Sequence, residues 1–169
     1  MGSPRKKHVE VRRLRAAEAK HYRSLLVEAL IVHPDCFVED YREELARPIT
    51  ETEQELERSG AFGAWEGNRL IGIAAEVPCT AMKRRHCGQF RNLYVRREYR
   101  RNGVARRLIQ EILTYCSRRV ERLEAEIPAQ CEAAIQLFEE HGFRLCGLSP
   151  NGLRIGSDAL DVWTMVRTL

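Results

Sequence analysis

The sequence predicts an α/β (α+β) fold, in which one domain holds a mixed central sheet flanked by helices. Its 169 residues suit a single domain with a substantial core, and a hydrophobic content of 44% is enough to fold it. Strand-like and helical patterns alternate along the second half of the chain. No internal repeat and no linker divides the sequence, so we expect the domain to span residues 8–169.

The first part of the chain is mainly helical after one strand. Residues 1–7 are polar and are expected to form a mobile tail. Alternating apolar residues at 9–14 predict a strand. Apolar residues at helical spacing over 22–30 then predict a helix, which Pro34 ends.

Two more helices are expected before the next strands. The spacing by four of apolar residues over 37–45 predicts a short helix, which Pro48 ends. Thr50 and Glu53 fit a capping box, in which the threonine caps an acidic helix that ends by residue 60.

A hairpin follows these helices. Residues 61–65 and 70–77 predict two strands joined by a turn at 66–69, and Pro78 closes the second strand. Residues 79–88 form a charged loop. Two interpretations stay open for it: a solvated connector, or a rim that meets an acidic substrate or the phosphates of a cofactor.

The stretch from Gln89 to Cys116 organises the chain. It begins with a strand at 90–95, continues through an arginine-rich turn at 96–102, and enters an amphipathic helix at Gly103. Backbone N–H groups at a helix start lack intrahelical partners, and the helix dipole adds positive potential there. A glycine also lets an anion approach the backbone closely. This stretch therefore predicts a phosphate site.

The C-terminal part completes the sheet. It is predicted, in order, as a strand at 122–127, a helix at 131–141 and strands at 143–148 and 160–166, with turns at 149–152 and 156–158 between the last two strands.

Composition excludes several classes of protein. Lys+Arg is 28 and Asp+Glu is 24, so the net charge of +4 does not indicate a nucleic-acid partner. Six cysteines without a CxxC pair argue against a metal site. No apolar run is long enough to cross a membrane, so we expect no membrane partner, reduced thiols and a cytoplasmic location.

Two motifs carry a resemblance to a known family. Arg100-Arg101-Asn102-Gly103-Val104-Ala105 resembles the Arg/Gln-x-x-Gly-x-Gly/Ala signature of the GNAT family, the Gcn5-related N-acetyltransferases. Residues 130–143 resemble that family's Asn-x-x-Ala-x-x-Leu-Tyr-x-x-x-Gly-Phe. The resemblance covers nearly the whole chain and implies acetyl-CoA as the cofactor, held as a co-substrate.

The resemblance also implies where the cofactor lies. In the family it lies in a wedge between two parallel strands that splay apart, here the strands at 90–95 and 122–127. The loop would hold the pyrophosphate, and backbone groups of the strand would bond the pantetheine arm. The expected cofactor-binding residues are Leu93, Tyr94, Val95, Arg100, Arg101, Asn102, Gly103, Val104, Ala105, Arg106, Cys131 and Phe138.

The chain departs from the family pattern at three positions. Phe138 stands where the family has a tyrosine that usually protonates the departing thiolate, and phenylalanine has no proton to give. Cys131 stands where an asparagine contacts the cofactor. Gln89 stands where some members have a glutamate base. Phe138 and Cys131 also fit ordinary core positions, so structural and functional interpretations both stay open.

Other acidic residues could replace the missing base. Glu76 and Glu126 are the candidate general bases, ahead of His86. The function implied is direct transfer of an acetyl group to a primary amine of a small molecule or peptide. The alternative is a weak or inactive acyl-CoA-binding sensor. A homodimer is compatible with the resemblance, and the acceptor has no readable motif.

Overall fold

The computed structural model describes residues 8–169, so the tail predicted at 1–7 lies outside the described residues. One seven-stranded sheet runs through the molecule in the order β1-β2-β3-β4-β5-β7-β6. Its strands are β1 (Val9–Arg13), β2 (Phe62–Glu66), β3 (Arg69–Pro78), β4 (Cys87–Val95), β5 (Arg122–Pro128), β6 (Arg144–Ile155) and β7 (Asp158–Thr168). Only β4 and β5 pair in parallel among these strands, so the predicted mixed sheet is confirmed.

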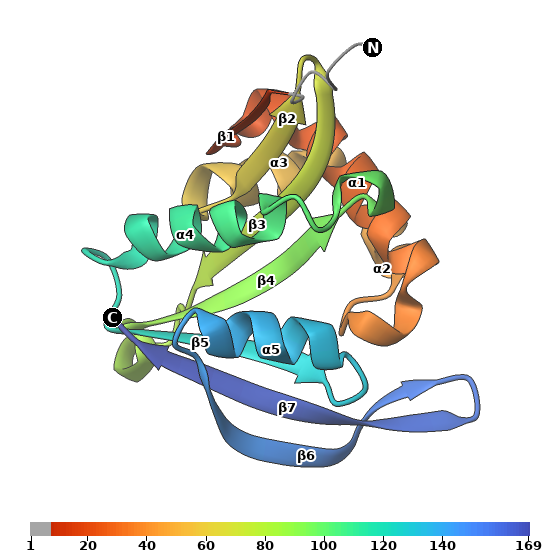
Figure 1. Cartoon of the computed structure of the whole chain (residues 1–169), viewed down its shortest axis with the longest axis vertical. Coiled ribbons are helices and arrows are strands. Elements are labelled where there is room, and N and C mark those ends of the chain that lie inside the picture. Colours follow the sequence, from red (N-terminus) through yellow and green to blue (C-terminus); the bar gives the residue numbers. More distant parts are fainter. Residues whose placement is uncertain (1–7) are drawn as a thin grey trace, which may run out of the picture.

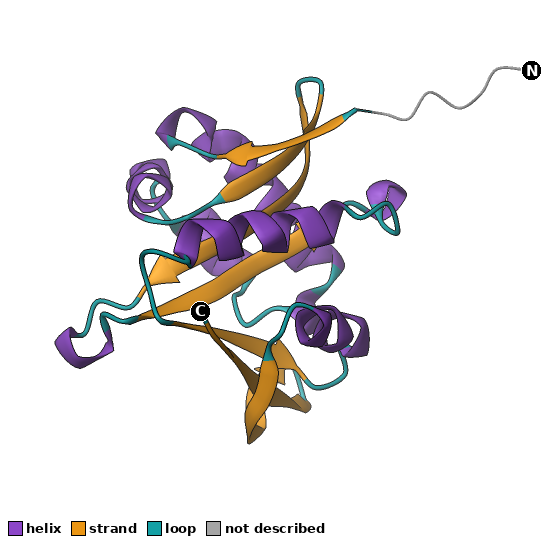
Figure 2. Cartoon of the chain, turned by 60° about the vertical axis from the view of Figure 1, so that its left-hand side comes forward, coloured by secondary structure: helices purple, strands orange, loops and turns teal. Residues whose placement is uncertain are grey.

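Helices cover both faces of the sheet (Figures 1 and 2). The helices are α1 (Ala19–Val32), α2 (Tyr41–Ala46), α3 (Ile49–Arg58), α4 (Val104–Cys116) and α5 (Glu132–Glu140). The buried apolar residues of α4 and α5 pack with one face of the sheet into one core. Those of α1 and α3 pack with the other face into a second core. Burying a large aliphatic or aromatic side chain contributes roughly 1.5–3 kcal/mol, so the two cores hold the layers together.

The central parallel pair opens along its length. β4 and β5 are in register from Cys87 with Arg122 to Phe90 with Ala125, and their pairing ends there. Beyond Phe90 the strand β4 contains a bulge, because Asn92 adopts a left-handed conformation with a φ of 57°. The bulge leaves β4 paired with β3 but turns its remaining residues away from β5. The predicted splayed pair is therefore present.

The predicted helix at 37–45 and the predicted capping box are wrong in detail. Pro34 starts a separate short 3-10 turn, Pro34–Cys36, and Phe37 after it is extended. Helix α2 begins only at Tyr41, where the Asp40 carboxylate caps the N–H of Arg42 at 2.8 Å.

Helix α3 starts earlier than the capping box predicted. Its N-cap is Pro48, and Thr50 lies inside the helix. Arg47, in the short connection before α3, binds Glu44 of α2 at 3.0 Å and Glu55 of α3 at 2.8 Å. The connection is therefore held to both helices.

The last hairpin is longer than predicted. The predicted turn at 149–152 lies inside β6, where the register with β7 shifts between Ser149 and Leu153. The shift lets the strand pass Pro150 without breaking the hairpin, so the chain turns only at residues 156–157. Strand β4 also begins at Cys87, three residues earlier than expected, because Cys87 pairs with Arg122 of β5 and Gly88 pairs with Pro78 of β3.

Candidate active site

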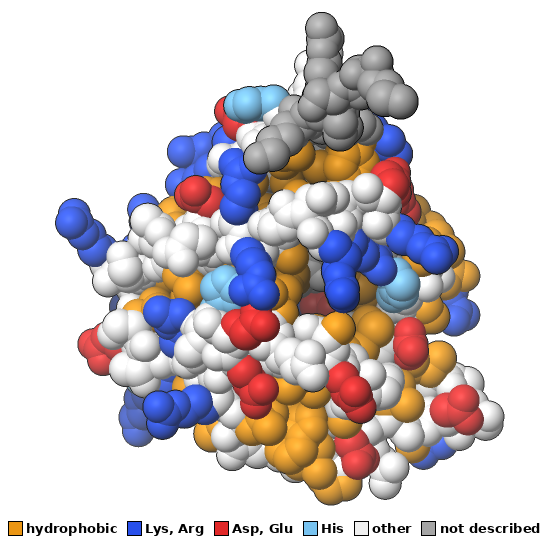
Figure 3. All heavy atoms as spheres, in the orientation of Figure 1, with side chains coloured by type: hydrophobic (Ala, Val, Ile, Leu, Met, Phe, Trp, Pro, Cys, Tyr) orange, Lys and Arg blue, Asp and Glu red, His pale blue; other side chains and the backbone are white. Residues whose placement is uncertain are grey.

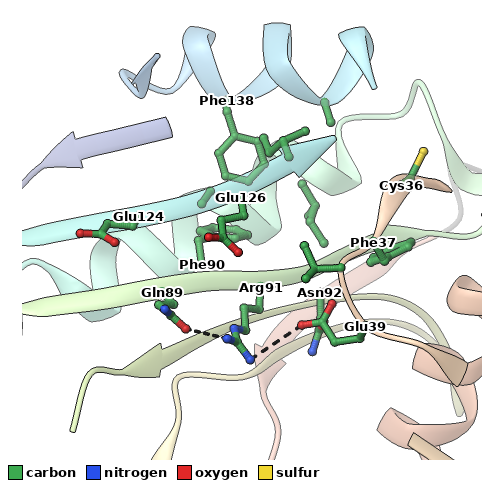
Figure 4. Close-up of a pocket in the computed structure, with 15 residues that line it drawn as sticks. Cys36, Phe37, Glu39, Gln89, Phe90, Arg91, Asn92, Glu124, Glu126 and Phe138 are labelled. Carbon is green, nitrogen blue, oxygen red and sulfur yellow. Dashed lines mark hydrogen bonds and ion pairs between the residues drawn. The ribbon is translucent and has the colours of Figure 1, made fainter. Parts of the chain in front are cut away.

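A pocket of about 120 Å³ opens where β4 and β5 diverge (Figure 4). Residues from β4, β5, α5 and the connection between α1 and α2 line it. They are Cys36, Phe37, Val38, Glu39, Gln89, Phe90, Arg91, Asn92, Leu93, Glu124, Ala125, Glu126, Ile127, Ala134 and Phe138. The divergence of the strands creates the space, because the backbone of β4 past Phe90 no longer pairs with β5.

One wall of the pocket is aromatic. Phe138 extends from α5 and meets Phe90 of β4 edge to face, with ring centroids 4.9 Å apart. Phe143 meets Phe138 in the same manner at 4.9 Å. Such pairs contribute roughly 0.5–1.5 kcal/mol beyond the area they bury. Phe138 is 4% exposed, so it serves both as a core residue and as a wall of the pocket.

The opposite wall carries charge. Glu39, Glu124 and Glu126 line the pocket with one arginine, Arg91. Glu39 faces Arg91 at 3.7 Å. Glu124 is held by Arg84 at 2.7 Å, on the charged loop that precedes β4.

Glu126 is the acid of this wall that stays available. It is exposed, and in Figure 4 its side chain lies between the Phe138 ring and Arg91. Within residues 8–169 its carboxylate forms no hydrogen bond or ion pair, unlike those of Glu39 and Glu124. An unpaired carboxylate in a pocket can bind a cation or accept a proton from a ligand.

The loop before α4 has the backbone of an anion site. Arg101 and Gly103 are both left-handed, with φ values of 63° and 77°, and Gly103 is the N-cap of α4. No atom lies within 4 Å of the position that a Cβ on Gly103 would take. The unpaired N–H groups of the first turn of α4 therefore face open space, as anion binding at a helix start requires.

The arginines of this loop differ in what they do. Arg100 turns back onto the protein, since its Nε donates to the carbonyl of Val95 at 2.8 Å. Arg101 is exposed. Arg106 joins α4 to α5 through an ion pair with Glu140 at 2.5 Å. Figure 3 shows basic side chains gathered along the seam between α4 and α5, around a hollow on this face.

The three expected strand residues lie on different sides of β4. Leu93 lines the pocket. Val95 is buried in the core beneath α4. Tyr94 is buried in the other core, and its hydroxyl donates to Glu28 of α1 at 3.3 Å. Burial, together with the Glu28 carboxylate, raises the pKa of Tyr94. Its side chain thus points away from α4, and only its backbone is placed to meet a ligand in the wedge.

The structure places the candidate base Glu76 outside this pocket. Glu76 is 4% exposed, and its carboxylate faces Gly60 and Gly88. A Cβ on Gly88 would stand 2.5 Å from Oε1 of Glu76, so the glycine is what makes room for the carboxylate. Burial raises the pKa of this group, against the opposing effects of the Gly60 N–H and of Arg119. Of the two candidate bases, only Glu126 lines the pocket.

Cys131 lies just outside the pocket, at the residue that precedes α5. Its thiol contacts the thiol of Cys36, which does line the pocket. Phe138 and Cys131 are thus both close to the pocket, although only Phe138 forms its wall.

Two functional features were missed by sequence reasoning. Asn92 creates the bulge in β4, and its amide donates to the Tyr22 hydroxyl at 2.8 Å. The signal was an asparagine inside an apolar strand, since asparagine tolerates the left-handed conformation. The second is the segment 36–39, which lines the pocket instead of forming a helix. Its signal was Asp40, a better helix cap than any residue near Phe37.

The fold and this site together define an acyltransferase that uses an acyl-CoA. Such a cofactor needs two parts of the protein, and both are present. One is the wedge between β4 and β5, and the other is the anion loop at the start of α4. A family model agrees: that of the acetyltransferase (GNAT) family matches residues 22–143. The chain belongs to the GNAT family of acetyltransferases, and its cofactor is acetyl-CoA.

Solved structures share the fold across almost the whole chain. The acetyltransferase of the GNAT family from Streptococcus pneumoniae is 20% identical with a TM-score of 0.84, and the match covers 96% of this chain and 99% of that one. Ribosomal-protein-alanine N-acetyltransferase from Brucella melitensis is 23% identical with a TM-score of 0.80, covering 95% and 99%. The yncA protein of Salmonella typhimurium, solved with its cofactor acetyl-CoA, is 17% identical with a TM-score of 0.82, covering 95% and 94%. No curated protein sequence matches this chain significantly.

The residues present fit this cofactor. The left-handed loop and the open space at Gly103 suit the pyrophosphate, and Arg101 adds positive charge beside it. The unpaired edge of β4 beyond Phe90 suits the amide groups of the pantetheine arm. Within residues 8–169 no cluster of three or more potential metal ligands occurs, and no helix has the length and apolar character to cross a bilayer.

Proposed function

We propose that this protein is an N-acetyltransferase that moves the acetyl group of acetyl-CoA directly onto a primary amine. The observation that carries the proposal is the position of Glu126, an unpaired carboxylate in the pocket at the open end of the parallel strands. The cofactor, when bound, supplies an acetyl thioester. The chain's own residues must then deprotonate the amine, stabilise the oxygen of the thioester and position both reactants.

Glu126 is the proposed general base. An amine arrives mainly as an ammonium at neutral pH and cannot attack until it loses a proton. The Glu126 carboxylate attracts the ammonium and accepts that proton, directly or through one water molecule. Because Glu126 is exposed, the proton can pass from its carboxylate to solvent after each turnover.

Backbone groups of β4 stabilise developing charge on the thioester oxygen. Past Phe90 the strand has lost its partner β5, so N–H groups on that edge are available to a ligand. The Asn92 bulge fixes their direction, since its side chain is anchored to Tyr22. Donors held in place in this way need no reorganisation during the reaction.

The chain offers no proton donor for the departing thiolate at position 138. Phe138 supplies an apolar wall there, together with Phe90. The wall excludes water from the thioester and orients it, and the thiolate leaves without acid assistance. We infer that the reaction is slower than with a tyrosine at this position, and that it takes place in the cytoplasm, where acetyl-CoA is available.

The charge of the pocket favours a cationic acceptor. Three carboxylates and one arginine line it, which gives a local excess of negative charge. Glu39 and Glu126 approach from opposite sides, on the α1–α2 connection and on β5. An amine with a second positive group, such as a polyamine or a basic peptide, meets both carboxylates.

The test combines binding and turnover. Calorimetry should show acetyl-CoA binding, and an amine panel should contain spermidine, lysine, an aminoglycoside and an alanine-initiated peptide, the last suggested by the relative from Brucella melitensis. Glu126→Gln should lower kcat/KM by about a hundredfold at unchanged acetyl-CoA affinity. Glu76→Gln, which changes a buried residue outside the pocket, should lower kcat/KM far less. Glu139→Gln, which changes an exposed residue, should leave kcat/KM unchanged. No binding of acetyl-CoA, or equal activity of Glu126→Gln, removes the proposal.

The second candidate is a non-catalytic acyl-CoA sensor. One observation favours it, namely the absence of a hydroxyl at Phe138 in an otherwise complete cofactor wedge. A sensor binds acetyl-CoA and acetylates no amine of the panel. Turnover by the wild-type protein therefore decides between the two candidates.

A further inference from the structure

Two cysteines that are far apart in the sequence meet beside the pocket. Cys36 ends the short 3-10 turn between α1 and α2, and Cys131 precedes α5. Their sulfur atoms lie 2.6 Å apart although 95 positions separate them in the sequence. Both side chains are partly buried. The proposed catalytic steps use neither thiol.

The contact belongs to a wider docking of the same two segments. The Gln130 side chain donates to the carbonyl of Asp35 at 2.7 Å. The Cys131 thiol lies 3.8 Å from that carbonyl. Two adjacent residues of the β5–α5 connection, Gln130 and Cys131, therefore hold the 3-10 turn in place. These contacts hold the two segments together where the two sulfurs meet.

The segment next to Cys36 controls access to the pocket. We call residues 36–39 the strap. All four line the pocket, and they run from α1 toward the cap of α2 (Figure 4). Within residues 8–169, Glu39 is tied to Arg91 of β4 by a single ion contact of 3.7 Å between an exposed arginine and a partly buried carboxylate, which is a weak link. The strap is thus firmly placed at its Cys36 end and loosely placed at its Glu39 end.

We propose that Cys36 and Cys131 form a reversible disulfide that fixes the strap to the β5–α5 connection and restricts entry of the acceptor. The disulfide makes this protein's acetyl transfer sensitive to oxidation. The effect on turnover rests on the proposed function, whereas bond formation and the fixing of the strap do not.

The oxidation balances with hydrogen peroxide as the oxidant. The Cys36 sulfur attacks one peroxide oxygen, the O–O bond breaks, and a sulfenic acid and one water form. The Cys131 sulfur then attacks the sulfenic sulfur and displaces the second water. Two S–H bonds and one O–O bond are lost, one S–S bond and two O–H bonds form, and the two electrons reduce peroxide to water. Dithiothreitol reverses the change by thiol–disulfide exchange.

The order of the two steps follows from the surroundings of each thiol. Cys36 lines the pocket, so a small oxidant reaches it. Burial raises the pKa of the Cys131 thiol, and the neighbouring Cys36 and Asp35 add to that effect. Because the thiolate is the reactive form, Cys131 reacts poorly with peroxide from solvent and serves as the partner that resolves the sulfenic acid.

The first experiment asks whether the bond forms. The full chain is treated with hydrogen peroxide, digested without reduction and mapped by mass spectrometry. A peptide pair joined through Cys36 and Cys131, with the loss of two hydrogens and of two titratable thiols, is expected. Cys36→Ser and Cys131→Ser should each abolish the pair, while Cys146→Ser, which changes an exposed cysteine, should keep it. Absence of the joined peptides overturns the proposal.

The second experiment asks what the bond does. Amide hydrogen exchange of residues 36–39 should slow at least tenfold in the oxidised protein and return with dithiothreitol. Acetylation of the best amine of the panel by the wild-type protein should fall at least tenfold on oxidation. The activity of Cys36→Ser should be the same before and after peroxide treatment. Unchanged exchange overturns the proposal. If no amine is acetylated in either state, the proposed function fails, and peptide mapping and exchange still decide on the disulfide.

Discussion

The guanidinium of Arg100 donates a hydrogen bond to Nε2 of His33 at 2.9 Å, and this contact joins the end of α1 to the start of the phosphate loop. Arginine has no acceptor, so Nε2 of His33 accepts this hydrogen bond. The same guanidinium donates from Nε to the Val95 carbonyl and stacks over the Tyr94 ring at 5.6 Å. Arg100 thus holds the loop in shape, with its donors directed at the protein.

Arg100→Ala should weaken acetyl-CoA binding about tenfold, because Arg100 positions the loop through hydrogen bonds from a charged group and the loss of one such bond has an effect of this size. The loss should depend little on salt. Arg101→Ala should weaken binding in a way that disappears at high salt, because the exposed Arg101 acts through its charge alone. Calorimetry at two ionic strengths measures both, with the exposed Arg118→Ala as the control. A salt-dependent loss in Arg100→Ala would show that its charge acts on the cofactor instead.

Gly103 and Gly67 allow a matched comparison of two left-handed glycines. Their φ values are 77° and 56°, and at neither glycine would an added Cβ meet an atom within 4 Å. Alanine at either position should therefore cost about 1–2 kcal/mol of stability through backbone strain. Gly67 lies in the β2–β3 turn, whereas Gly103 starts α4. Only Gly103→Ala should also lower acetyl-CoA affinity, since its methyl group occupies the approach of the anion. Equal affinities of the two variants would place the pyrophosphate elsewhere.

The sequence predicted the order of elements well, because each element carries its own local signal. Helix α4 shows an apolar stripe, and Gly103 marks its start. The parallel pairing of β4 with β5 came from the family resemblance, and its register was not predictable. That register depends on contacts between residues about 35 positions apart, which no short pattern encodes.

The sequence predicted the parts of the site less evenly. The anion loop is local, so its glycine and arginines were readable. Glu76 and Glu126 looked alike in the sequence, but Glu76 is buried against Gly60 and Gly88, whereas Glu126 lines the pocket that opens where β4 and β5 diverge. The meeting of Cys36 with Cys131 was equally unreadable, since it depends on how α1 and α5 pack on opposite faces of the sheet.

Phe138→Tyr should raise turnover about tenfold if departure of the thiolate limits the rate, because the new hydroxyl can donate a proton at the pocket wall. The edge-to-face contacts with Phe90 and Phe143 fix the ring, so the hydroxyl should take one position. The pH profile of kcat should gain a falling limb near the ordinary tyrosine pKa of about 10. Phe138→Leu keeps an apolar wall and should show neither change. Unaltered turnover in Phe138→Tyr, with acetyl-CoA binding intact, would show that departure of the thiolate does not limit the rate.

Glu76→Gln should stabilise the protein at neutral pH. Burial raises the pKa of Glu76 above its ordinary value of 4.5, so the folded state holds a proton that the unfolded chain releases. The contribution of Glu76 to the stability of the wild type is therefore largest below pH 4.5. This contribution is lost as the pH rises through the pKa of Glu76 in the folded state. Glutamine does not titrate, and Oε1 of Glu76 has no hydrogen-bond partner in the described part of the chain. The advantage of the variant should grow from about pH 4 to about pH 7 and reach on the order of 1 kcal/mol, because the wild type must then either bind a proton or bury a charge at this position. Urea unfolding across this pH range measures the difference in the free energy of unfolding, with the exposed Glu139→Gln as the control. If Glu76→Gln were less stable than wild type at neutral pH, the Glu76 carboxylate would be charged and favourably held.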